Sequence, residues 1–192
     1  MAGLTAWFAL VERGHVRSGV RVLIEGTGGV ALFGVQIAKM HGAEVIVSGS
    51  ADKLDRVLQL GADHVVDRRS ADWAETILAL TGDRGVDHVL ELVGGAHLGK
   101  VAEVVGVCGH IHLIVALEGF EVSTPVLPIL MKDITIHGIC TGHRHALTEL
   151  GSAIDSTETK PVIGARYPFG DLPAALDHLD RGPFGKIVVE VG

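Results

Sequence analysis

The chain has 192 residues, 47% of them hydrophobic and 26 of them glycine, and its formal net charge of −7 argues against a nucleic-acid partner, which needs clustered Lys and Arg. No apolar run approaches the ~18 residues that span a bilayer, and the N-terminus lacks a basic leader, so neither a membrane partner nor secretion is expected. Cys108 and Cys140 are too few and too isolated for a disulfide framework, which suits a reducing cytoplasm.

Six short β-branched runs alternate with helical patterns along the chain. The expected strands are VRVLIE (20–25), AEVIVS (43–48), DHVVD (63–67), VDHVLELV (86–93), HIHLIVAL (110–117) and DITIHGI (133–139). The expected helices cover 29–40, 53–60, 73–80, 98–105 and 144–155, and Gly61 is placed where the second of them ends. Apolar runs without strict alternation suit strands covered on both faces. These units predict an α/β fold with a doubly wound, six-stranded parallel sheet, Rossmann-like in type.

The alternation of predicted strands and helices changes after Lys160. The C-terminal segment predicts a short strand, a proline-started helix over 172–180, a turn, and a last strand over 185–191. We therefore expect a dinucleotide-binding domain over 1–160 and a strand-helix-strand tail over 161–192, which either extends the sheet or forms another layer. Before the sixth strand, STPVLPILMKD contains two prolines and is expected to begin as an irregular loop.

A glycine-rich turn follows the first strand, in the order Gly26-x-Gly28-x-x-Ala31. The first glycine permits a sharp turn, the second lets the backbone approach a pyrophosphate, and the small third residue lets helix and strand pack closely. Backbone N–H groups of Gly28, Gly29 and Val30 would then point at the anion from the start of a helix. The alternative is a glycine-rich turn that binds no ligand.

The end of the second strand bears on which nucleotide is bound. NAD sites normally carry an acidic residue there, to accept the ribose 2′-hydroxyl. This chain has Ser48 and Ser50 instead, with no carboxylate until Asp52, and Lys53 and Arg56 follow. Hydroxyl and ammonium groups suit a 2′-phosphate, so NADP(H) is predicted over NAD. The alternative is that the two basic side chains only solvate a helix face.

With these residues in view, the chain resembles the cofactor-binding half of the medium-chain dehydrogenase/reductases, above all the zinc-type alcohol dehydrogenases and quinone oxidoreductases. The matching stretches are AGLTAWFAL, VLIEGTGGVALFGVQIAK, KLDRVLQLGADHVVD, GDRGVDHVLELVGG and GPFGKIVVEV. They cover nearly the whole chain in the right order. Ala31 replaces the glycine common in that turn, but alanine is a permitted small residue there.

The resemblance implies an oxidoreductase that transfers hydride between NADPH and a carbonyl, enone or quinone. A barrel-like catalytic domain would precede Met1 and supply substrate contacts and most zinc ligands. The chain is therefore expected to be a fragment with little activity alone, with no catalytic residue assigned and no metal site of its own. A non-catalytic nucleotide-binding or assembly module is the alternative.

The resemblance also implies where the nicotinamide lies and how copies associate. Strand ends facing the nicotinamide carry Val93, Gly94, Ala116, Leu117, Ile139 and Cys140. Related enzymes pair through the strand equivalent to DITIHGI, so a homodimer is expected.

Other candidate site residues are supported by weaker patterns. His110 and His112 would share one strand face, and His143 and His145 form a second pair, but no third ligand is tied to either by spacing, so surface or hydrogen-bonded histidines are expected. Tyr167 is followed four residues later by an aspartate, which excludes a Tyr-x-x-x-Lys mechanism. A methyltransferase usually has an acidic residue after the second strand, where this chain has serines, so that function is disfavoured.

Overall fold

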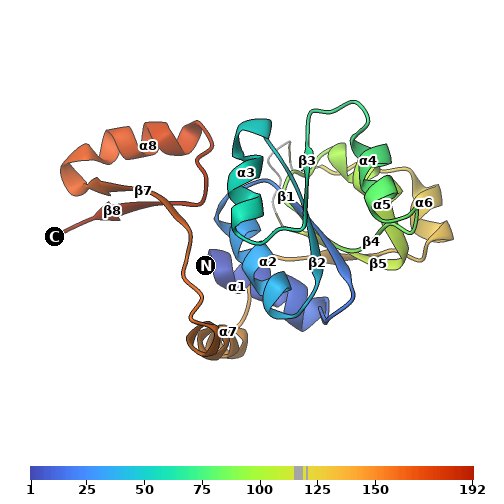
Figure 1. The fold of residues 1–192 in the computed structure, drawn as a ribbon, viewed down its shortest axis with the longest axis horizontal. Coiled ribbons are helices and arrows are strands. Elements are labelled where there is room, and N and C mark those ends of the chain that lie inside the picture. Colours follow the sequence, from blue (N-terminus) through green and yellow to red (C-terminus); the bar gives the residue numbers. More distant parts are fainter. Residues whose placement is uncertain (115–118, 120) are drawn as a thin grey trace.

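The computed structural model describes residues 1–114, 119 and 121–192. A six-stranded, all-parallel sheet forms its centre, in the order β3-β2-β1-β4-β5-β6 (Figure 1). The strands are β1 (Arg21–Glu25), β2 (Glu44–Gly49), β3 (His64–Asp67), β4 (Val86–Glu91), β5 (Val105–Leu113) and β6 (Thr135–Gly138). The sequence-based prediction of a doubly wound parallel sheet is therefore confirmed.

Helices cover both faces of the sheet, because the strands are apolar on both sides. One face packs against α1 (Ala2–Trp7), its π-helical continuation η1 (Phe8–Arg13), α2 (Gly29–Met40), α3 (Ala51–Gln59) and α7 (Arg144–Thr157). The other packs against α4 (Trp73–Leu80), α5 (His97–Val104) and α6 (Val126–Met131). Each layer buries its own apolar cluster, so β1 and β2 lie in a dry interior.

Glycine ends the helices that lead into the sheet. Gly42 follows α2 with φ 74° and Gly61 follows α3 with φ 98°, a backbone region that glycine enters without steric cost. The Lys39 ammonium lies 2.8 Å from a carboxylate oxygen of Asp63, which also accepts the N–H of Val45 at 2.7 Å. The predicted role of Gly61 is confirmed, and the turn is tied to both α2 and β2.

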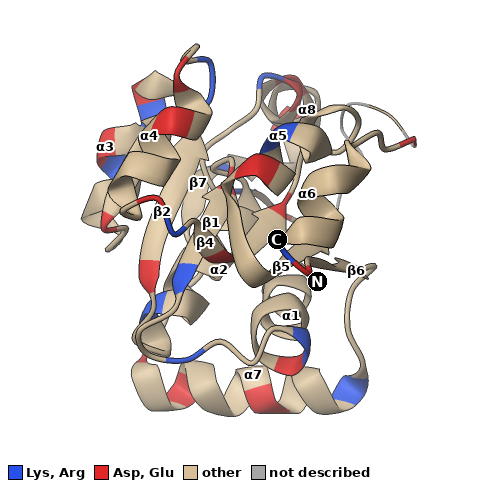
Figure 2. Cartoon of the chain, turned by 90° about the vertical axis from the view of Figure 1, so that its right-hand side faces the viewer, with Lys and Arg blue, Asp and Glu red and all other residues tan. Residues whose placement is uncertain are grey.

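The N-terminal helix α1 with η1, and helix α6, were not predicted, whereas α7 was. Helix α1 with η1 packs beside α2, and α7 lies beneath α1 (Figure 2). The proline-containing segment is irregular only as far as Pro125, where α6 begins. The predicted strand end at Ala116 and Leu117 lies outside the described residues. Within the described part of the chain, no helix has the length and apolarity needed to cross a membrane.

The C-terminal tail forms a separate layer and does not extend the main sheet. It consists of β7 (Ile163–Pro168), the short helix η2 (Phe169–Asp171), α8 (Leu172–Asp180) and β8 (Lys186–Glu190). The strands β7 and β8 pair in parallel as a two-stranded sheet at one side of the molecule (Figure 1). The boundary at residue 160 stays a prediction.

The tail contacts the glycine turn directly. Gly185 N–H donates to the carbonyl of Thr27 at 2.9 Å, in a parallel bridge between Gly28 and Gly185. The Arg56 guanidinium lies 3.9 Å from the ring centroid of Phe184, a cation–π contact. These contacts hold the start of β8 against the loop that begins α2.

Candidate nucleotide site

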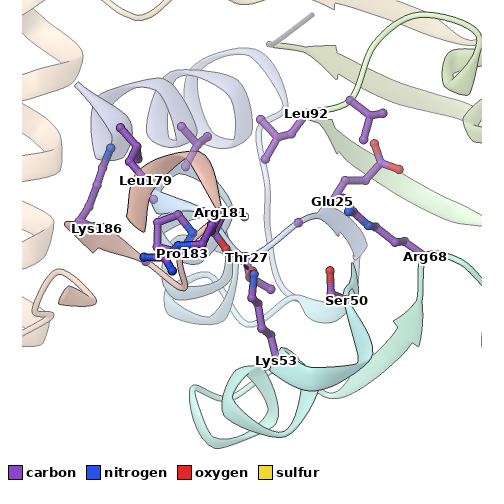
Figure 3. Close-up of a pocket in the computed structure, with 18 of the residues that line it drawn as sticks. Glu25, Thr27, Ser50, Lys53, Arg68, Leu92, Leu179, Arg181, Pro183 and Lys186 are labelled. Atoms are coloured by element: carbon purple, nitrogen blue, oxygen red, sulfur yellow. Dashed lines mark hydrogen bonds between the residues drawn. The ribbon is translucent and has the colours of Figure 1, made fainter. Parts of the chain in front are cut away.

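A large cavity of about 1280 Å³ lies between the glycine turn and the C-terminal tail (Figure 3). Its floor is the carboxyl end of the sheet, which is where ligands bind in open α/β folds. Nine of the predicted residues line it: Gly26, Gly28, Gly29, Val30, Ala31, Ser48, Ser50, Lys53 and Val93. The structure thus brings most of the predicted site together.

The glycine turn has the geometry that close ligand approach requires. Gly26 has φ 85°, in the left-handed region, so a side chain there would strain the backbone. Gly28 is the N-cap of α2, and a Cβ added at either glycine would meet no atom within 4 Å. Ala31 is fully buried where α2 meets the sheet. The first amides of α2 have no partner within the helix, and its N-terminus carries positive partial charge.

The second strand's end is more structural than the sequence indicated. Ser48 is buried, and its hydroxyl accepts the indole N–H of Trp73 at 2.8 Å. Ser50 is the N-cap of α3 and lines the open cavity. Lys53 also lines the cavity, where its ammonium donates to the carbonyl of Gly182 in the tail. Of these three, Ser50 and Lys53 are the better placed to contact a ligand.

Several cavity residues were not predicted from the sequence. Lys53 is joined there by five further cationic side chains, Arg68, Arg69, Lys100, Arg181 and Lys186, against the carboxylates of Glu25 and Asp52. The Arg68–Arg69 pair directly follows the third strand, which was a usable signal. The tail residues come from a distant part of the chain, and only docking brings them to the cavity.

Lys186 occupies a specific place, over the start of α2. A Cβ added at Gly29 would lie 2.3 Å from Lys186 Cε and 3.0 Å from its Nζ. The lysine stem therefore covers Gly29, and its ammonium lies beside the N-terminus of the helix. Positive charge from a side chain and from the helix converge at one point, as an anion site requires.

The residues predicted to face the nicotinamide do not lie together in the structure. Val93 lines the cavity, and the Gly94 N–H donates to Glu91 Oε1 at 2.9 Å. Ile139 is buried and Cys140 is exposed, and neither lines the cavity. Ala116 and Leu117 lie outside the described residues.

Two buried carboxyl groups lie at the base of the cavity, with a histidine beside them. Glu25 ends β1, Glu91 ends β4, and His97 begins α5. The His97 Nε2 and Glu25 Oε1 atoms form a close ion pair or hydrogen bond. Burial, together with the neighbouring Glu25 carboxyl, raises the pKa of Glu91 to about 8.

Four histidines stack on one face of β4, β5 and β6, which we call the histidine stack: His88, His110, His112 and His137. Neighbouring ring centroids lie 5.2 to 5.7 Å apart, at interplanar angles of 12° to 21°. His110 Nδ1 lies 3.1 Å from His137 Nε2. His110 and His112 therefore share a strand face, as expected, and the strand register adds the other two.

Comparison with known proteins agrees with this architecture. Residues 29–156 match the zinc-binding dehydrogenase family. The chain belongs to this family. It corresponds to the cofactor-binding domain of a medium-chain dehydrogenase/reductase, as the sequence predicted.

The curated relatives are longer than this chain. It is 32% identical over 99% of its length to a zinc-type alcohol dehydrogenase-like protein of Schizosaccharomyces pombe, and spans 58% of that protein. It is 29% identical over 96% of its length to the quinone oxidoreductase of Rattus norvegicus, and spans 59% of it. The chain thus covers about three fifths of each.

Solved structures give the same picture. A crystal structure of an alcohol dehydrogenase candidate from Sinorhizobium meliloti 1021 shares 59% identity and a TM-score of 0.95, covering 99% of this chain and 56% of that one. A mycobacterial protein in complex with NADPH shares 28% identity and a TM-score of 0.86, with 100% of this chain and 64% of that one covered. An NAD-dependent alcohol dehydrogenase shares 30% identity and a TM-score of 0.90, with 100% of this chain and 57% of that one covered.

Proposed function

We propose that this domain binds NADP(H), for an oxidoreductase that transfers hydride between NADPH and a carbonyl, enone or quinone. The observation that carries the proposal is the convergence of six cationic side chains on the cavity at the glycine turn. A dinucleotide with a 2′-phosphate carries more negative charge than NAD, so this excess of positive charge favours it. The NADPH complex of a structural neighbour supports the same choice, whereas another neighbour is NAD-dependent.

Four of the six cations fall into two groups by position. Lys186 and the first amides of α2 surround the glycine turn, where a pyrophosphate would be held. Ser50, Lys53, Arg68 and Arg69 surround the ends of β2 and β3, where the adenosine ribose would lie. In Figure 3, Lys53 and Arg68 both extend into the cavity from this side.

When bound, the nicotinamide supplies the hydride, and this domain's residues bind and orient the nucleotide. Positioning of the reactants is worth ~7 to 11 kcal/mol, so activity of this domain alone should be far below that of an intact reductase. Neither Cys108 nor Cys140 belongs to a group of metal-ligating side chains among the described residues. The two cysteines therefore do not form a zinc site, and the resemblance places most zinc ligands outside this chain.

The test is calorimetric titration of three variants with NADPH and NADH. Arg68→Ala should weaken NADPH roughly tenfold to a hundredfold and leave NADH unchanged, because charge-assisted hydrogen bonds contribute ~1.5 to 3 kcal/mol. Lys186→Ala should weaken both nucleotides, because both carry the pyrophosphate. Arg144→Ala, at the exposed start of α7, is the matched control and should change neither.

Three outcomes would contradict the proposal in different ways. Equal affinity for both nucleotides in the unaltered chain would remove the NADP preference. No binding of either would favour the assembly module. NADPH oxidation with a quinone, enal or aldehyde at rates typical of intact reductases would contradict the low activity of the domain alone.

We also propose a homodimer formed through β6. This strand is an edge of the main sheet, and Ile136 is 38% exposed on it. The adjacent α6 carries no charged residue (Figure 2), and Leu130 and Met131 are more than two-thirds exposed. A concentration-independent monomer by light scattering would contradict this arrangement.

A further inference from the structure

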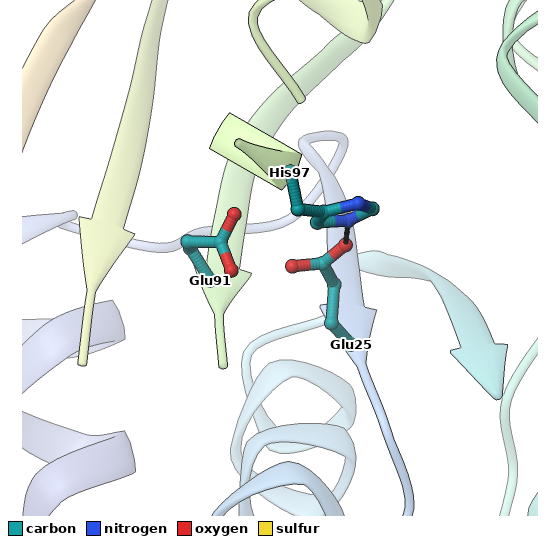
Figure 4. Close-up of side chains that lie close together, drawn as sticks. All are labelled: Glu25, Glu91 and His97. Carbon is teal, nitrogen blue, oxygen red and sulfur yellow. Dashed lines mark hydrogen bonds and ion pairs between the residues drawn. The ribbon is translucent and has the colours of Figure 1, made fainter. Parts of the chain in front are cut away.

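Three ligand-type side chains converge where two neighbouring strands end. Glu25 and Glu91 are the last residues of β1 and β4, which pair in parallel with Ile24 opposite Leu90. His97 opens α5, directly after the loop that follows β4. One oxygen or nitrogen atom from each lies within 4.8 Å of the others (Figure 4). Among the described residues, no other group of three His, Cys, Asp or Glu side chains meets this condition.

The carboxyl groups of Glu91 and Glu25 face each other with few donors between them. Glu91 is fully buried, and its Oε1 accepts the N–H groups of Val93 and Gly94 at 2.7 and 2.9 Å. Its Oε2 is also buried, and the Glu25 carboxyl is the side-chain hydrogen-bonding group beside it. The carboxyl of Glu25, itself only 3% exposed, is the group that faces it. Two buried carboxyls this close repel each other unless a proton or a metal ion lies between them.

We propose that Glu25, Glu91 and His97 bind one divalent transition-metal ion, for which Zn²⁺ is the best match. Two carboxylate oxygens and one imidazole nitrogen are a Zn²⁺ ligand set, whereas Ca²⁺ takes six to eight oxygens. Two carboxylates balance the charge of the ion. Glu25 and His97 line the cavity, so a water can complete the fourth position from that side. The ion would tie β1, β4 and α5 together beneath the nucleotide.

The sequence analysis predicted no metal site in this chain, so the proposed site differs from that expectation. Its ligands are not the cationic residues on which the proposed NADP(H) selectivity depends, although Glu25 and His97 line the same cavity. The carboxylates end rigid central strands, which limits how far the ligands must move to close on an ion.

The histidine stack is the competing location for an added metal ion. Its rings are nearly parallel, so their in-plane nitrogen lone pairs run side by side instead of converging on one point. His137, on the edge strand, is half-buried, whereas His88 and His112 are buried. It therefore provides the matched control.

The experiment titrates Zn²⁺ into the chain after treatment with a chelator, followed by calorimetry, and repeats the titration with Co²⁺, followed by its visible absorption. One ion per chain is expected, with the intense Co²⁺ bands of a four-coordinate site. Glu91→Gln keeps the shape and removes one ligand charge, and His97→Gln removes the nitrogen ligand. Each should weaken Zn²⁺ by more than about tenfold, since even residues that only support a ligand cost 10- to 100-fold. His137→Gln should leave the affinity unchanged.

Circular dichroism and urea unfolding check that each variant is folded, and two independent ligand variants guard against one that is not. No Zn²⁺ binding by the unaltered chain, or equal binding in Glu91→Gln and His97→Gln, would overturn the site and leave a shared proton as the cation. Loss of binding only in His137→Gln would move the ion to the histidine stack and overturn the proposal equally.

Discussion

Acidification should destabilise this protein through its histidine stack. His88 is 4% exposed and His112 is fully buried. Burial, with smaller contributions from the neighbouring histidines, lowers the pKa of His88 to about 4 and that of His112 to about 2. The pKa values of His110 and His137 are lowered in the same direction, again chiefly by burial. The titratable and charged groups that act electrostatically on the stack include Arg13 at the end of η1, His15 just after it, and Asp87 in β4.

The direction of the pH effect on stability follows from proton uptake. Below an ordinary histidine pKa of 6.5, the unfolded chain binds a proton at each site, while the folded chain does not until about pH 4 at His88 and about pH 2 at His112. Stability is therefore fully present above pH 6.5 and is lost as the pH falls. Each pH unit costs about 1.4 kcal/mol per histidine, so at pH 5 each contributes a loss of about 2 kcal/mol and the pair about 4 kcal/mol. Total stabilities are only about 5 to 15 kcal/mol.

The assay compares urea unfolding of the unaltered chain with His112→Gln and with the double variant His88→Gln/His112→Gln, at pH 7 and pH 5, with chelator present. Between pH 7 and pH 5, the free energy of unfolding of the single variant should rise by about 2 kcal/mol relative to that of the unaltered chain. That of the double variant should rise by about 4 kcal/mol. Glu91, whose raised pKa acts in the opposite direction over this range, titrates alike in all three and leaves the difference unaffected. If the free energy of unfolding changes by the same amount from pH 7 to pH 5 in all three proteins, the reasoning is refuted. A constant destabilisation by a substitution at both pH values would not affect this test.

Three further predictions concern stability, each measured by urea unfolding. Gly34→Ala should cost about 1 to 3 kcal/mol, because its Cβ would lie 2.5 Å from the buried Leu90 Cδ1; an unchanged midpoint would mean that α2 can shift freely. Trp73→Phe should cost about 1 kcal/mol, since Ser48 loses its indole donor, and NADPH affinity should stay the same; a large loss of affinity would show that Ser48 orients the ligand. Lys132→Met removes three hydrogen bonds to carbonyls at the end of α5 and should cost about 1 to 3 kcal/mol, whereas no change would mean that water replaces the ammonium.

The features predicted well from the sequence are those that depend on neighbouring residues. The turn at Gly26 and Gly28, the six strands and the glycine after α3 all follow from local backbone preferences and hydrophobic pattern. Helix α6 was not predicted, because two prolines suggested a loop although one of them, Pro125, stands where a helix can start.

The parts of the site that were not predicted depend on contacts between distant segments. Lys186 reaches Gly29 only because the tail docks on the turn, and periodicity contains no signal for that docking. Glu25 and Glu91 could have been paired, since both end neighbouring strands in the expected order. The approach of His97 to Glu25 depends on the path of the loop after β4, which the sequence does not specify.

The contact between the start of β8 and the glycine turn makes a bound nucleotide a reversible cross-link. A pyrophosphate held by both Gly29 and Lys186 would join the beginning of α2 to the end of the chain, although these segments meet only through folding. Undocking of the tail would then require release of the ligand. The short connection over 158–162 would become harder for a protease to cut as nucleotide concentration rises, even though no nucleotide touches it.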